Sequence, residues 1–216
     1  MKRRILLYLL ISSVSINMNA QYIPALPSCN VFKNKNEFLT EGNISLYGYH
    51  GKLAFSLFKN INLNLNFLHQ PKNYFMHLDN SFHRSLDPSV GWCSRYKIFF
   101  FEFYSGYGFG KSDYGTSLDP NNHTYTYYNK AFIQLNLGAE IVYNTQCALI
   151  IKTCRLLYPY YKTVTFEPSI FVSPIVKNNL YLVFIITLTE YDENLSFPSF
   201  NYGFGMKYYF RKRKEI

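Results

Sequence analysis

The stretch FIQLNLGAEI, residues 132–141, indicates most clearly how this chain folds. Along it, apolar side chains alternate with polar or small ones. The apolar set is Ile133, Leu135, Leu137, Ala139 and Ile141. Gln134, Asn136 and Glu140 belong to the opposite set. A repeat of two residues is typical of a β-strand whose two faces meet different surroundings, so the stretch predicts a strand with one apolar and one polar face.

The same alternation recurs along the chain and predicts ten strands. They cover residues 43–49, 52–58, 62–69, 88–96, 98–109, 130–142, 147–157, 164–173, 179–190 and 199–210. Aromatic residues make up 19% of the chain and charged residues only 16%, a composition that favours strands over helices. Several segments reach the roughly 9–11 residues that a tilted strand needs to cross a bilayer.

The expected connections differ in length at the two ends of the strands. Even-numbered connections are short: residues 59–61, 97, 143–146 and 174–178. Odd-numbered connections are longer, at 70–87, 110–129, 158–163 and 191–198, except for a short first turn at His50-Gly51. Short turns at one end and long loops at the other are typical of outer-membrane barrels. We therefore expect an all-β fold, an antiparallel up-and-down transmembrane barrel of about ten strands (8–10).

The N-terminal residues resemble an export signal. Lys2, Arg3 and Arg4 precede a short apolar stretch at 5–16, and Ala20 offers a cleavage point. We expect a signal peptide at 1–20, an irregular periplasmic segment at 21–42, the outer-membrane barrel at 43–210 and a basic tail at 211–216.

Charged residues on the strands are expected to fill a narrow polar lumen. This predicted cluster comprises Arg95, Glu102, Glu140, Arg155, Glu167 and Lys207. We expect Glu102 and Glu140 to pair with Arg95 and Arg155, because unpaired charges inside a barrel are costly. Lys152 and Arg155 have opposite parity, so either one of them leaves the interior or a bulge intervenes.

The last strand ends in alternating apolar residues that resemble the C-terminal signal read by the barrel-assembly machinery. They are Phe204, Met206, Tyr208 and Phe210. The tail Arg211-Lys212-Arg213-Lys214 departs from that signal, in which the aromatic residue is usually last. Two interpretations of the tail stay open, a solvated extension or a contact with inner-leaflet phosphates.

No motif points to a catalytic, cofactor, metal or nucleic-acid site. Cys29, Cys93, Cys147 and Cys154 lack zinc-site spacing, and three disulfide pairings are open. The expected partners are outer-membrane lipid and lipopolysaccharide. We also expect the Tyr-rich loop at 114–128 to bind a glycan or a protein through its aromatic rings.

The sequence is compatible with three functions. The first is a non-enzymatic barrel with a structural or binding role. The second is an envelope-lipid enzyme that uses Ser81, His83 and Asp79 or Glu102. The third is a soluble lipocalin-like carrier.

Several short motifs occur along the chain in an order that resembles that of a known protein family. They are Tyr22-Ile23-Pro24, the run 32–37, Gly106–Gly110, Phe132-Ile133-Gln134 with Gly138, Arg155, and Phe166-Glu167-Pro168. This order is similar to that of small outer-membrane β-barrel proteins of Bacteroidetes, over about residues 22–210. The resemblance implies a location and a fold but no defined activity. Asn30 and Asn36 depart from it where Pro and Gly are usual, and no lipoprotein-type Cys ends the signal.

Overall fold

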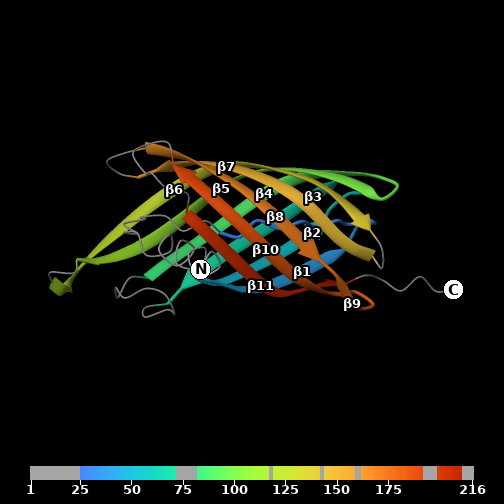
Figure 1. Cartoon of the computed structure of the whole chain (residues 1–216). Helices are drawn as coiled ribbons and strands as arrows, with labels where there is room; N and C mark the ends of the chain where they lie inside the picture. The colour runs from blue at the N-terminus through green and yellow to red at the C-terminus, as the bar shows by residue number, and fades with distance from the viewer. Residues whose placement is uncertain are drawn as a thin grey trace, which may run out of the picture.

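The protein is a closed β-barrel with antiparallel up-and-down topology (Figure 1). The computed structural model describes residues 25–71, 82–116, 119–141, 144–158, 162–191 and 199–210. The strands are β1 (Phe38–Ser45), β2 (Gly48–Ser56), β3 (Ile61–Gln70), β4 (Phe82–Tyr96), β5 (Phe99–Thr116), β6 (Asp119–Ile141), β7 (Thr145–Leu157), β8 (Lys162–Ser173), β9 (Ile175–Lys177), β10 (Leu180–Tyr191) and β11 (Ser199–Phe210). Because β1 pairs with β11 as well as with β2, the sheet has no free edge along this seam.

Ten strands form the wall, as predicted, because β9 continues β8 beyond Pro174 and pairs with the same neighbour, β10. The described part of the chain contains no helix long and apolar enough to cross a membrane. The predicted signal peptide and basic tail lie outside the described residues.

The first hairpin differs from the prediction. Its turn lies at Leu46-Tyr47, and His50 and Gly51 lie within β2. Gly48 has a φ of 138°, which favours glycine at the start of β2. Gly51 instead makes room for the ring of Phe67, since a Cβ on Gly51 would come within 1.7 Å of that ring. The prediction of a turn at Gly51 was therefore wrong, because this glycine serves packing.

The predicted loop at 110–129 is also wrong. These residues continue β5 and β6 as a long hairpin, with Gly110 opposite Tyr128 and Gly115 opposite His123. The pairing of β5 with β4 ends at Asp113, and that of β6 with β7 ends at Asn129. The hairpin therefore projects beyond the adjoining strands as a two-stranded ribbon (Figure 1).

The two faces of the wall differ as residues 132–141 predict. Ile133 and Leu137 are exposed on the outer face, whereas Gln134, Asn136 and Glu140 are buried on the inner face. Other strands repeat this arrangement, with exposed Leu, Ile, Val and aromatic side chains outside and buried Asn, Ser, Lys and Glu inside. The outer face of the barrel is thus apolar, whereas the inner face combines polar side chains with buried apolar ones such as Ile150, Phe171 and Val183.

The described part of the segment before β1 lies inside the barrel. Residues 25–32 have no regular secondary structure and are all buried, and the chain then turns at 34–36 into β1. Leu26 packs over Gly203 of β11, where a Cβ would come within 2.1 Å of the Leu26 Cδ1. We call residues 25–37 the N-terminal plug. The prediction treated this irregular stretch as lying outside the barrel, because no sequence pattern marks it as interior.

Candidate functional site

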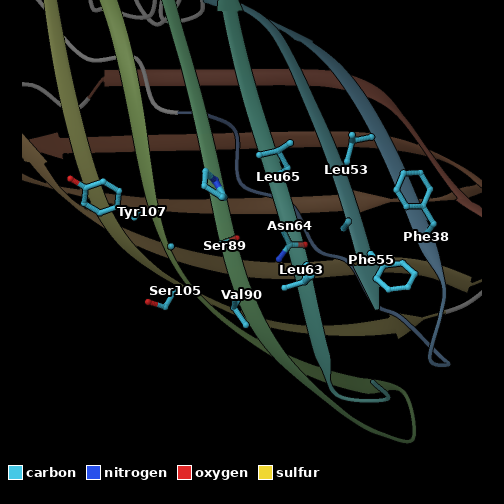
Figure 2. Close-up of a pocket in the computed structure, with 13 residues that line it drawn as sticks. Phe38, Leu53, Phe55, Leu63, Asn64, Leu65, Ser89, Val90, Ser105 and Tyr107 are labelled. Carbon is cyan, nitrogen blue, oxygen red and sulfur yellow. The ribbon is translucent and has the colours of Figure 1, made fainter. Parts of the chain in front are cut away.

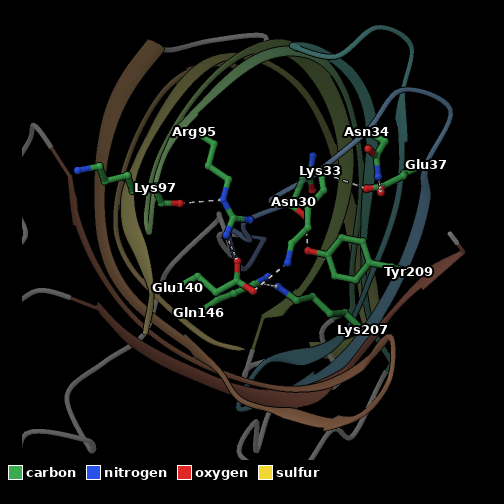
Figure 3. A network of polar contacts seen from close by, with 10 residues as sticks. All are labelled: Asn30, Lys33, Asn34, Glu37, Arg95, Lys97, Glu140, Gln146, Lys207 and Tyr209. Carbon is green, nitrogen blue, oxygen red and sulfur yellow. Dashed lines mark hydrogen bonds and ion pairs between the residues drawn. The ribbon is translucent and has the colours of Figure 1, made fainter. Parts of the chain in front are cut away.

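The interior face of the wall, together with the N-terminal plug, contains most of the charged residues singled out from the sequence. Glu102, Glu140, Glu167 and Lys207 are buried inside the barrel. Arg95 also points inward, near one end of the barrel (Figure 3). These residues fall into separate groups, each with its own contacts.

Arg155 is a correction, because its side chain is exposed on the outer face. The register of β6 with β7 runs without a shift from Asn129 opposite Leu157 to Ile141 opposite Thr145, so no bulge reverses the faces. Lys152 is the cation of β7 that enters the interior. Its Nζ lies 3.5 Å from a carboxylate oxygen of Glu167.

Glu102 binds the N-terminal plug. Its carboxylate accepts hydrogen bonds from the backbone N–H of Asn30 at 3.1 Å and from that of Val31 at 2.7 Å. The Nδ2 of Asn136 donates a further bond at 2.7 Å. The predicted pairing of Glu102 with Arg95 or Arg155 is therefore wrong. The carboxylate satisfies buried peptide groups that no strand partner reaches.

The carbonyl groups of the plug are bound by side chains from well-separated strands. The Ser28 carbonyl accepts from Lys52 Nζ at 3.3 Å and from Gln134 Nε2 and Asn136 Nδ2, each at 3.2 Å. The Cys29 carbonyl accepts from Lys207 Nζ at 3.4 Å.

Two further contacts hold the plug. The Asn30 carbonyl accepts from the Tyr209 hydroxyl (Figure 3), and the Leu26 N–H donates to His50 Nδ1 at 3.1 Å. His50 was expected in the first turn, and Lys52 and Tyr209 had no predicted role. The one signal in the sequence is their position on the inward-facing side of the strand alternation, which does not by itself indicate contact with the plug.

A second group lies at the end of the barrel where the even-numbered connections run, residues 57–60, 97–98, 142–144 and 178–179, which we call the near end. Here Glu140 accepts from both Arg95 and Lys33, the latter at 3.1 Å (Figure 3). The predicted pair of Glu140 with Arg95 is thus present, and the plug supplies the second cation. A cavity of about 490 Å³ opens beside these side chains.

The third group lies toward the opposite end, which we call the far end. Lys130 Nζ lies 2.7 Å from Asp87 Oδ2, and both side chains are almost wholly buried. Gly108 provides the space, because a Cβ there would come within 2.3 Å of Asp87 Oδ1. A buried pair of this kind is costly to break, since each partner would leave a charge in the interior.

Of the groups considered for catalysis, the structure describes His83 and Glu102, and each has a different partner. His83 Nε2 lies 2.8 Å from the Tyr128 hydroxyl, while Glu102 is occupied by the plug. Asp79 and Ser81 lie outside the described residues. Within the described ranges, no group of three or more His, Cys, Asp or Glu side chains is placed to hold a metal ion.

All four cysteines are free thiols. Cys29 lies in the plug and is completely buried. Burial raises the pKa of its thiol well above the ordinary value, so the thiol stays protonated.

Apolar hollows open on the outer wall. One of about 630 Å³ lies across β1 to β5 and is lined from Phe38 of β1 through Leu63 of β3 to Tyr107 of β5 (Figure 2). The residues proposed as an assembly signal also lie on this outer wall. Phe204, Met206, Tyr208 and Phe210 are all exposed along β11.

A scan against protein-family models finds no match for this chain, and a search of curated proteins finds no relative.

Proposed function

We propose that this protein is an outer-membrane β-barrel, closed by its own N-terminal segment, with a structural or binding role and no catalytic one. The supporting observation is the distribution of side chains. Large apolar side chains such as Ile44, Val90, Trp92 and Phe103 are exposed on the outer wall, while the buried Asn, Ser, Lys and Glu side chains lie on the inner face beside buried apolar ones. This arrangement suits a barrel surrounded by lipid, where the backbone is satisfied only by a closed sheet.

A soluble lipocalin-like carrier requires the reverse arrangement, with a polar outer surface and an apolar cavity inside. Here the interior is filled by the plug, which packs against apolar side chains such as Phe100, Ile150 and Phe171 as well as making polar contacts, so the described residues leave no open apolar cavity around it. The apolar hollow of Figure 2 faces outward. Exposed apolar surface of this extent is unfavourable in water. The observations therefore favour the membrane barrel over the carrier.

The plug also argues against an open pore. Residues 25–32 are buried among side chains of β1, β2, β5, β6 and β11, so they occupy the path that an ion would take. The projecting β5–β6 hairpin is the natural place for a glycan or protein ligand, since it extends beyond the wall. In this proposal the far end faces the cell exterior and lipopolysaccharide. The motif resemblance to small barrels of Bacteroidetes agrees with such a location.

The decisive experiment is cell fractionation combined with gel migration before and after heating. We expect the protein in the outer-membrane fraction. Unheated samples should migrate faster than boiled ones, because a closed barrel resists detergent unfolding. Recovery of the processed chain in the aqueous fraction without detergent would overturn the proposal and favour the carrier.

A further inference from the structure

The near end of the barrel carries a set of exposed lysines, which we call the basic rim: Lys35, Lys59, Lys97 and Lys177. Glu37 and Glu140 also lie at this end, but both are buried. Glu37, the last residue of the plug, accepts bonds from the Lys33 N–H at 2.9 Å and from Asn34 Nδ2 at 2.8 Å. Among the described residues, the near end therefore exposes cations without exposing acids.

Three of these lysines directly follow an exposed apolar residue. Phe58 precedes Lys59, Tyr96 precedes Lys97 and Val176 precedes Lys177. Tyr96 is 70% exposed, and the Lys97 Nζ lies 5.4 Å from the centre of its ring. Lys97 points away from the barrel interior (Figure 3). The Tyr96 ring and the Lys97 ammonium group thus lie side by side at this end. At the other two positions an exposed apolar residue directly precedes an exposed lysine.

We propose that the basic rim binds the phosphate groups of anionic phospholipids in the leaflet next to the near end. This inference rests on the proposed insertion in a membrane. An apolar side chain followed by a lysine matches the boundary between acyl chains and headgroups, where aromatic rings and snorkelling ammonium groups are favourable. A cation near an anionic leaflet contributes about 1 kcal/mol, which corresponds to about a fivefold preference for an anionic lipid.

The arrangement favours lipid over a soluble acidic polymer. Lys97 extends outward past the wall, so its charge is directed at molecules that surround the barrel and not at one that enters the mouth. By contrast, Arg95 and Lys33 point into the mouth and already share Glu140. Lys59 lines the same cavity as these two cations but, within the described ranges, shares no carboxylate with them. The lysines of the rim have no ion-pair partner among the described residues, so their charge is available to the surrounding lipid.

The only tryptophan of the chain provides a direct assay. Trp92 is 45% exposed on the outer wall of β4 and precedes Tyr96 near the same end. The protein purified from membranes is reconstituted in phosphatidylcholine vesicles that contain either brominated phosphatidylglycerol or brominated phosphatidylcholine, because bromine quenches an adjacent indole. We expect phosphatidylglycerol to quench Trp92 with about a three- to fivefold higher relative affinity, and 0.5 M NaCl to weaken that preference.

The matched variants are the triple substitution Lys59→Gln, Lys97→Gln and Lys177→Gln, and a control with Arg155→Gln and Lys162→Gln on the outer wall toward the far end. We expect the triple variant to lose the preference and the control to keep it.

Equal quenching by both lipids in the wild type, or an unchanged preference in the triple variant, would overturn the inference while leaving the membrane barrel intact. Absence of quenching by either lipid would contradict the membrane barrel itself. Quenching by brominated phosphatidylcholine in the triple variant also shows that this variant is folded and inserted.

Discussion

Replacing Glu102 by Gln should loosen the N-terminal plug by a calculable amount. The Glu102 carboxylate accepts bonds from the N–H groups of Asn30 and Val31, both buried. A hydrogen bond to a charged group contributes about 1.5–3 kcal/mol and one to a neutral group about 0.5–1.5 kcal/mol, so each bond should lose about 1 kcal/mol. The substitution should therefore favour release of the plug by about 2 kcal/mol.

Alkylation of Cys29 measures that release. The thiol is fully buried and its raised pKa keeps it protonated, so a maleimide should reach it only after the plug leaves the interior. In a background where Cys93, Cys147 and Cys154 are replaced by Ser, the alkylation rate should rise about 30-fold in Glu102→Gln, at about tenfold per 1.4 kcal/mol.

The control is Glu167→Gln, which removes another buried carboxylate whose contacts, Lys152 and Thr165, belong to the wall. We expect its alkylation rate to stay within about threefold of wild type, since the described contacts of Glu167 do not include the plug and the effects of sites without shared partners are independent within about 0.3–0.5 kcal/mol. If Glu102→Gln leaves the rate unchanged, or if Glu167→Gln raises it equally, the proposed role of Glu102 is refuted. The same holds if wild-type Cys29 reacts as fast as a free thiol.

Further predictions concern the pore, the seam and catalysis. Wild-type protein in planar bilayers should show no steady large conductance, whereas deletion of residues 21–36 should open one; an equally silent deletion variant that still shows heat-modifiable migration would count against the plug. Gly205→Ala should abolish heat-modifiable migration, because a Cβ there would come within 2.0 Å of the Gly42 carbonyl oxygen across the β1–β11 seam; retention of the fast-migrating form would contradict this. Replacing Ser81 or His83 by Ala should leave the mass spectrum of lipid A unchanged, and a shifted spectrum would revive the envelope-lipid enzyme.

The wall of the barrel was predictable from the sequence because strand parity is a local property. Residues 132–141 show it, since each residue's face follows from its neighbours and the register of β6 with β7 never shifts. Where parity was ambiguous, at Lys152 and Arg155, the sequence analysis left two alternatives, and the unbroken register selects Lys152 as the interior cation.

Glycine serves two purposes in this barrel, and its position in the sequence does not distinguish them. Gly51 was interpreted as a turn although it lies under the ring of Phe67 within a strand. Gly48, with its positive φ, is the glycine that begins β2 after the turn. Whether a glycine bends the chain or makes space for a side chain depends on the strand beside it, which a single sequence does not show.

Alternation of apolar residues with polar or small ones by itself determined that this chain forms a ten-stranded wall with an apolar outer face, because that pattern recurs in most segments. Only the tertiary structure decided what fills the interior. The plug has no periodicity, and its peptide groups are satisfied by Lys52, Glu102, Asn136 and Lys207, which come from strands distant in sequence. These side chains converge only once the sheet has closed, so no local pattern could indicate that they bind the plug.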